Sequence, residues 1–196
     1  ALSRVVLFGG EDSTTYLADT WTFTTVPPAI AAVTPNAGSV TGGTTVTITG
    51  SAFTGATAVR FASTAAASFH VDSATQITAV TPAKGVGSYN VEVTTPGGTS
   101  AAGHVYRYVA PPAVTSLSPA SGTIHGGTTV NIVGSGFTGA TTVMFGSYPA
   151  ASFHVISPTH VTAITPAEPS GSHNVIVTTP VATSATIIAD RFTFTS

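Results

Sequence analysis

The sequence predicts an all-β protein in which a β-hairpin precedes two tandem antiparallel β-sandwiches. Three observations lead to this prediction. Apolar residues alternate with Thr and Ser in many short stretches, Gly and Pro interrupt these stretches, and the pattern returns after 84 residues. Alternation with a period of two is typical of strands that bury one face, and Gly and Pro mark the turns between strands.

The return of the pattern divides the chain into three parts. The repeated runs are residues 42–46 with 126–130, residues 68–71 with 152–155, and residues 93–96 with 177–180. We expect the two copies to align without a gap from Pro27 to the end of the chain. Because the identity extends over whole domains, we predict a segment at 1–26, a first domain at 27–110 and a second at 111–196.

Strands can be placed inside each copy from the alternation. Residues 45–49, Thr-Val-Thr-Ile-Thr, predict a strand whose apolar side chains enter the core while its Thr side chains face water. Val59 and Phe61 alternate in the same way. About six or seven such strands in each copy favour an antiparallel sandwich. We expect Phe53 and Phe137 to fill the interior of the two sandwiches.

The repeated glycines and strands resemble a known family. In the first copy the motif comprises Val-Thr-Pro-Asn-Ala-Gly at 33–38, the run from Gly42 to Phe53, and Val-Arg-Phe at 59–61; the second copy repeats it at 118–122, 126–137 and 143–146. This motif is similar to that of the IPT/TIG family of immunoglobulin-like domains. The resemblance implies an immunoglobulin-like sandwich in each copy. The copies differ where Ala62 stands in place of Gly146, a difference that we expect to matter little.

The first 26 residues contain two further strand-like stretches. Residues 4–10, Arg-Val-Val-Leu-Phe-Gly-Gly, and residues 17–23, Leu-Ala-Asp-Thr-Trp-Thr-Phe, flank a polar turn. Together they resemble part of a Kelch repeat, which pairs a strand ending in Gly-Gly with a strand carrying Asp and Trp. A second interpretation stays open, because residues 18–24 also resemble residues 189–195. On that interpretation the segment is the end of a preceding domain.

Either interpretation leaves the hairpin in need of a neighbour. A lone two-stranded hairpin is marginally stable in water, and this one would expose Val5, Leu7, Trp21 and Phe23. We therefore expect these four residues to form an assembly interface with another copy of the chain or with a neighbouring domain.

Composition excludes several classes of function. Charged residues make up 6% of the chain, the net charge is −2 and there are five Lys and Arg together. So few cations cannot form the basic surface that nucleic acid requires. The chain has no Cys, which rules out disulfides and thiolate metal sites, and no apolar run approaches the roughly 20 residues of a membrane span. No signal peptide is visible at Ala1, so we expect a mature chain or an excerpt of one.

The sequence also lacks a recognisable catalytic constellation. Its seven acidic residues are scattered, and its six His do not cluster. His70 and His154 hold equivalent places between Phe and Val, so we expect them to point away from the core. His173 replaces Tyr89, an exchange that suggests an ordinary tolerated position. We predict no catalytic residues, no metal site and no cofactor.

Two functions agree with this composition. The leading prediction is a non-catalytic extracellular structural protein, a repeat segment of a cell-surface stalk or filament that assembles through β-strand contacts. The alternative is an adhesin or a carbohydrate-binding accessory module of a larger secreted or surface protein. In that case Tyr16 and Tyr148 could stack on the sugar rings of a glycan. Both predictions place the protein outside the cell or on its surface.

Overall fold

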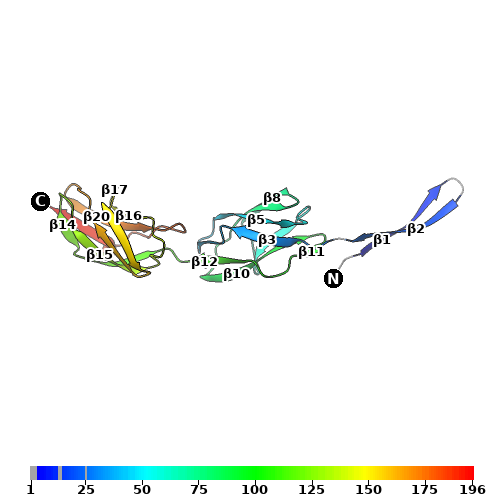
Figure 1. The fold of residues 1–196 in the computed structure, drawn as a ribbon, viewed down its shortest axis with the longest axis horizontal. Coiled ribbons are helices and arrows are strands. Elements are labelled where there is room, and N and C mark those ends of the chain that lie inside the picture. The colour runs from blue at the N-terminus through cyan, green and yellow to red at the C-terminus, as the bar shows by residue number, and fades with distance from the viewer. Residues whose placement is uncertain (1–3, 13–14, 25) are drawn as a thin grey trace. The chain divides into compact units, whose positions relative to one another are not determined.

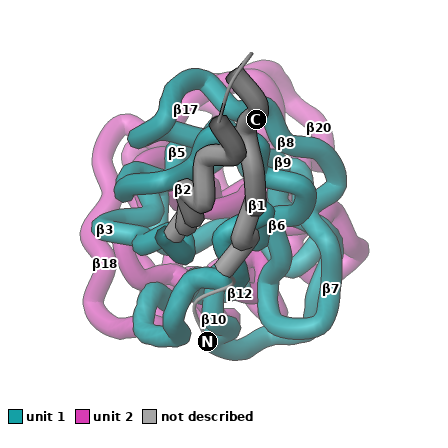
Figure 2. The backbone as a smooth tube through the Cα atoms, turned by 90° about the vertical axis from the view of Figure 1, so that its right-hand side faces the viewer, with its two compact units in different colours: residues 1–108 teal, residues 109–196 magenta. Residues whose placement is uncertain are grey.

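The computed structural model describes residues 4–12, 15–24 and 26–196, and for residues 4–24 it describes the backbone alone. The prediction of an all-β fold with tandem immunoglobulin-like sandwiches is confirmed. The chain divides into two compact units, residues 1–108 and residues 109–196 (Figures 1 and 2).

The hairpin precedes the first sandwich. Strand β1 (Arg4–Asp12) pairs antiparallel with β2 (Thr15–Thr24), and the two form a separate two-stranded sheet (Figure 1). The backbone register sets Val5 opposite Phe23 and Leu7 opposite Trp21. The four apolar residues singled out from the sequence therefore occupy alternate rungs of one ladder, with the Val6–Thr22 pair between them.

The first sandwich has two sheets. One sheet has the order β3 (Ala29–Thr34), β5 (Thr45–Ser51), β9 (Gln76–Val80), β8 (Ser68–Ser73). The other has the order β4 (Ala37–Ser39), β12 (Val105–Val109), β10 (Gly87–Thr95), β6 (Ala58–Phe61), β7 (Thr64–Ala65), and β11 (Gly98–Thr99) pairs with β10. Strands β5, β9 and β10 are each tied to a partner that is distant in sequence, whereas β8 pairs with its hairpin neighbour β9.

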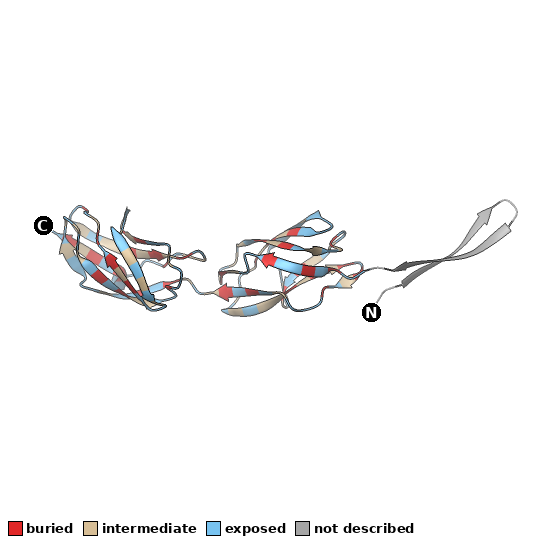
Figure 3. Cartoon of the chain, viewed as in Figure 1, coloured by how far each residue is buried: buried red, intermediate tan, exposed pale blue. Residues whose placement is uncertain are grey.

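The core lies between these sheets. Val46 and Ile48 of β5 are fully buried, whereas Thr45 and Thr49 are exposed, as the alternation predicts. Buried and exposed stretches alternate along the strands of the sandwich (Figure 3). Phe53 is fully buried as well. Burying one face of each sheet against the other removes apolar surface from water, which is the main stabilising contribution to such a domain.

The second sandwich repeats this plan. One sheet has the order β13 (Ala113–Ser118), β15 (Thr129–Ser135), β19 (His160–Ile164), β18 (Ser152–Ser157). The other has the order β14 (Ser121–Thr123), β21 (Arg191–Thr195), β20 (Gly171–Thr178), β16 (Thr142–Phe145), β17 (Tyr148–Pro149). Phe137 is fully buried, like its counterpart Phe53.

The expectation of a gapless repeat is wrong near the end of the chain. Gly87 pairs with Tyr108 in the first copy, and Gly171 pairs with Phe194 in the second. The offset between copies thus grows from 84 to 86 residues, so the second copy carries two extra residues before β21. They belong to a segment that forms the short 3-10 helix η1 (Ile188–Asp190). The buried Asp190 carboxylate holds this turn by accepting a 2.8 Å hydrogen bond from the Ile187 N–H.

Candidate interaction surface

Strand β18 is an outer strand of its sheet. It pairs with β19 on one side and ends the sheet order. An edge strand presents unpaired backbone N–H and C=O groups, which can pair with a further strand. We call residues 152–157 the β18 edge. The four strands of this sheet contain no Asp, Glu, Lys or Arg, so the surface beside the edge is uncharged.

Apolar side chains lie on the solvent side of this edge. Ile156 is 59% exposed and Ile164 of the neighbouring strand is 37% exposed. A shallow hollow of about 250 Å³ adjoins Ile164. Its lining residues are Thr129, Ser152, Phe153, His154, Thr162, Ala163 and Ile164. The β18 edge therefore combines free backbone groups with an uncharged, partly apolar surround.

The equivalent edge of the first sandwich differs at one position. In β8 the residue that corresponds to Ile156 is Asp72. Its Oδ2 accepts hydrogen bonds from Thr78 Oγ1 at 2.7 Å and from Gln76 Nε2 at 3.2 Å. The Thr78 bond is the main reason why the pKa of Asp72 lies below its ordinary value. Asp72 is thus ionised at neutral pH, and a charge on an edge strand discourages pairing with another strand.

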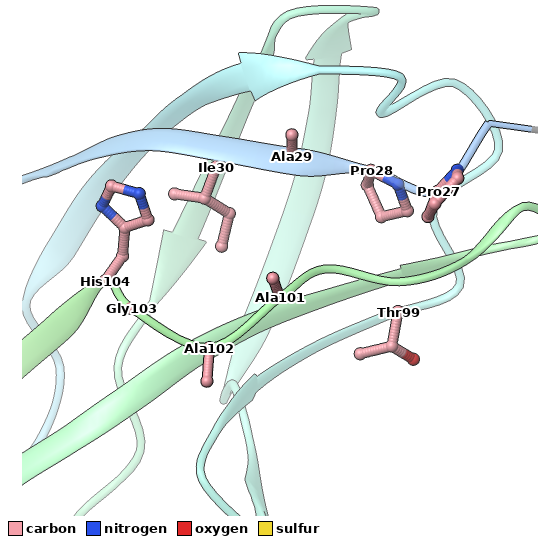
Figure 4. Close-up of a pocket in the computed structure, with 9 residues that line it drawn as sticks. All are labelled: Pro27, Pro28, Ala29, Ile30, Thr99, Ala101, Ala102, Gly103 and His104. Carbon is pink, nitrogen blue, oxygen red and sulfur yellow. The ribbon is translucent and has the colours of Figure 1, made fainter. Parts of the chain in front are cut away.

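A second hollow, of about 490 Å³, lies in the first sandwich between β3 and the segment before β12 (Figure 4). Its lining residues are Pro27, Pro28, Ala29, Ile30, Thr99, Ala101, Ala102, Gly103 and His104. These are small or apolar residues with one imidazole and no carboxylate. Such a lining offers van der Waals contact but few groups that would orient a polar ligand.

In the second sandwich the longer segment before β21 packs against the neighbouring strands. Helix η1, which this segment forms, contacts β13, the counterpart of β3. The two copies therefore differ both in the length of this connection and in what lies beside their first strand.

The second sandwich also contains a buried Glu–His contact that sequence reasoning missed. Glu168 Oε1 lies 2.9 Å from His173 Nδ1, and the Glu168 side chain is 1% exposed. In the first copy the corresponding residues are Lys84 and Tyr89, where the Lys84 ammonium lies 4.4 Å from the ring centroid of Tyr89. His173 is therefore not an ordinary tolerated exchange, because it changed together with the residue that it contacts.

The difference between Ala62 and Gly146 belongs to the same set and does matter. Both residues have positive φ, 50° and 56°. A Cβ on Gly146 would lie 2.6 Å from Glu168 Oε1 and 2.7 Å from His173 Nδ1. Gly146 thus leaves the room that the Glu168–His173 contact occupies. No single sequence reveals this link, because Gly146 lies far along the chain from the other two residues.

We expect the buried Glu168 carboxyl to make stability depend on pH. Burial raises the pKa of Glu168 above its ordinary value, and His173 partly offsets the rise. The folded state then holds the proton more tightly than the unfolded state, so stability falls as pH rises from about 4.5 through the raised pKa. Glu168→Gln is neutral at every pH, so urea unfolding should show that this variant lacks the decline.

The control for this prediction is Asp72→Asn. Because the pKa of Asp72 is lowered, the wild type should lose stability relative to Asp72→Asn as pH falls, the opposite direction. If the stability of the wild type and of Glu168→Gln changes with pH in the same way, Glu168 is not the group whose protonation changes the stability.

The remaining candidate residues lie on different strands and do not form one site. Tyr148 lies in β17, opposite Phe145, and is 46% exposed. The backbone of Tyr16 pairs with Glu11 in the hairpin, and its side chain lies outside the described part of the structure. His70 and His154 are exposed, as expected from the alternation.

Two kinds of feature are absent from the part of the chain that the structure describes. Among the side chains of residues 26–196, no three His, Asp or Glu come together in a way that could hold a metal ion. None of the helices described there is long and apolar enough to cross a membrane.

Comparison with solved structures finds similar arrangements. The extracellular region of plexin A4, domains 1 to 8, is 27% identical over 86% of this chain and 18% of that chain, with a TM-score of 0.50. A plexin A4 structure with domains 1 to 10 is 26% identical over 86% and 16%, with a TM-score of 0.53. This chain thus spans less than a fifth of the plexin chains it matches.

A third structure is more distant. SGBP-B from a xyloglucan utilization locus in Bacteroides uniformis is 21% identical over 80% of this chain and 47% of that chain, with a TM-score of 0.37. No curated protein sequence matches the chain. The IPT/TIG domain pattern, however, matches residues 28–108 and again residues 112–195. The chain belongs to the IPT/TIG family and carries two copies of its domain in tandem.

Proposed function

We propose that this chain is a non-catalytic, extracellular structural module, a repeat segment of a cell-surface stalk or filament that assembles through β-strand contacts. Two tandem IPT/TIG domains support a modular role. The likeness to the extracellular region of plexin A4 supports a place outside the cell. The domains, on this proposal, comprise residues 27–110 and 111–196, with residues 1–26 as the assembly segment.

The observation that carries the proposal is the separate β1–β2 sheet. Its strands are nine and ten residues long, and it has two strands only. Two strands alone are marginal in water, and further strands or a packed face supply the missing stability. Val5, Leu7, Trp21 and Phe23 form our proposed interface, since their backbones stand in register. A Kelch-like origin and the end of a preceding domain both fit this role.

Deletion of residues 1–26 tests the proposal. Because each sandwich has a core of its own, the shortened chain should keep its fold and lose its assembly. Sedimentation velocity across a range of concentrations measures the loss. Trp21→Ser should weaken assembly strongly, whereas the adjacent Thr22→Ser, as the matched control, should leave it intact. Assembly of the shortened chain at wild-type concentrations would contradict the proposal.

The alternative is a carbohydrate-binding or adhesive module. The exposed Tyr148 favours it, because a solvent-facing aromatic ring can stack on a sugar. In that case residues 27–196 should bind a glycan saturably, and Tyr148→Ala should remove binding without changing the thermal stability. Tyr16 would contribute from the hairpin. Equal binding by the wild type and Tyr148→Ala would contradict a role for this residue.

A further inference from the structure

We infer that the β18 edge accepts strand β2 of the hairpin from a second copy of this chain. The inference rests on the proposed function and names the surface that the hairpin occupies. It follows from a comparison of the sheet edges, from the charges beside them, and from the length of the uncharged run in β2.

Most edges of the two sandwiches are poor acceptors. Strands β4, β7, β14 and β17 are two or three residues long, too short for a stable ladder. Strands β3 and β13 each follow two consecutive prolines and precede another proline. Proline has no N–H and limits pairing at both ends of such a strand. Strands β8 and β18, each six residues long, remain.

The charge on Asp72 separates these two edges. A strand added to β8 would draw an ionised carboxylate out of water, which is unfavourable unless the partner supplies a cation. At the same position, between Val155 and Ser157 where the ladder to β19 shifts register, β18 has Ile156, which is 59% exposed, and a strand added beside it would cover part of this apolar surface. The β18 edge is therefore the better acceptor on both electrostatic and apolar grounds.

The lack of charged residues around β18 also indicates which strand can pair with it. Its sheet has no Asp, Glu, Lys or Arg, so a matching strand must be uncharged along its paired length. Residues 20–24 of β2, Thr-Trp-Thr-Phe-Thr, fulfil this condition and alternate with the period of a strand. Residues 5–10 of β1 are uncharged too, but they end in two glycines and contain a register shift between Phe8 and Gly10, so β2 is the better donor. The Thr and aromatic residues of β2 have high strand propensity. Five uncharged residues match the six-residue edge in length.

The arrangement has a consequence for assembly. The donor strand precedes the first sandwich and the acceptor edge belongs to the second, so each chain offers two unlike surfaces. Such a contact is head-to-tail and propagates unless the rotation between neighbours closes a ring. Strand addition at an edge is a known mode of protein association.

Exchanging the edge residues between the copies tests the inference. Ile156→Asp gives β18 the charge of β8 and should raise the concentration needed for assembly at least about tenfold, in sedimentation velocity. The thermal stability should not change, because Ile156 is mostly exposed. Ile156→Thr, which is uncharged and β-branched, should assemble nearly as the wild type does. Asp72→Ile should not weaken assembly.

The outcomes separate this inference from the proposed function. If deletion of residues 1–26 abolishes assembly but Ile156→Asp does not, the hairpin binds another surface and the inference is overturned. If Ile156→Asp abolishes assembly but the deletion does not, the β18 edge pairs with a different strand, which overturns the occupant and the proposed function. If neither change has an effect, both are wrong.

Crosslinking identifies the paired strands directly. The chain contains no Cys, so introduced thiols are unique. A mixture of Thr22→Cys and Ser152→Cys chains should form a mixed disulfide dimer on mild oxidation. Ser68→Cys places the thiol at the equivalent position of β8 and should form much less. Equal yields with Ser68→Cys and Ser152→Cys would overturn the choice of edge.

Discussion

Replacing Phe137 by Ala should lower the free energy of unfolding of the second sandwich by about 3–5 kcal/mol. Phe137 is fully buried in the cluster that includes Ile132 and Val161. Its backbone N–H donates to the carbonyl of Pro158 at 3.0 Å, so the residue is fixed while its ring fills the interior. Truncation removes the apolar contacts of the ring and leaves a cavity that a two-sheet core closes only in part.

The measurement is amide hydrogen exchange, followed separately in residues 27–110 and 111–196 because a chain of two domains has no single free energy of unfolding. The matched control is Phe153→Ala, whose half-buried side chain should give a clearly smaller loss. Phe53→Ala should repeat the large loss in the first sandwich. An equal loss of protection in both sandwiches after Phe137→Ala would contradict the separate cores.

Gly126→Ala should destabilise the second sandwich far more than Gly127→Ala, although the two glycines are adjacent. Both have positive φ, 75° and 80°, and an L residue there loses about 1–2 kcal/mol. A Cβ on Gly126 would also lie 2.6 Å from the carbonyl carbon of Pro166, whereas one on Gly127 would meet nothing within 4 Å. Because backbone must move, we expect about 1–3 kcal/mol more for Gly126→Ala.

The first sandwich supplies the control for this pair. Gly42 and Gly43 have the same conformations, and a Cβ on Gly42 would lie 2.5 Å from the carbonyl carbon of Pro82. Gly42→Ala and Gly43→Ala should therefore differ in the same direction when exchange is followed in residues 27–110. If both members of either pair lose the same stability on replacement by Ala, the positive φ alone requires glycine there, and the close approach of the backbone does not.

The fold could be predicted because its determinants are local. Alternation in residues 45–49 indicates which side chains enter the core. The second copy shows the same pattern in a separate domain, which supports the prediction. Phe53 and Phe137 were expected in the interior and are fully buried there. Backbone propensity and the apolar pattern agree at these positions, so short stretches of sequence are enough to predict the strands and their buried side chains.

The features that escaped prediction depend on contacts across the fold. The partnership of Glu168 with His173 becomes visible only when both are seen beside Gly146. The two-residue insertion before β21 escaped because residues 185–190 resemble the first copy too little to reveal a gap. The exposure of Ile156 at a sheet edge escaped too, because only the sheet order places β18 at an edge.

The interface residues of the hairpin remain a prediction from composition. Sequence alone pointed to Val5, Leu7, Trp21 and Phe23, and the backbone register sets them opposite one another in pairs. A sequence can indicate which apolar residues must be covered, but on this proposal the surface that covers them belongs to another molecule. The acceptor edge could be inferred only after all edges of the two sandwiches were compared.

Amide hydrogen exchange in residues 4–24, compared between assembled and dilute material, tests the central claim most directly. These amides should exchange quickly in dilute chains, because a lone hairpin is marginal, and slowly after assembly. Protection of the β18 edge should rise in parallel. Equal protection of residues 4–24 in dilute and assembled chains would contradict the claim that a second copy covers the hairpin.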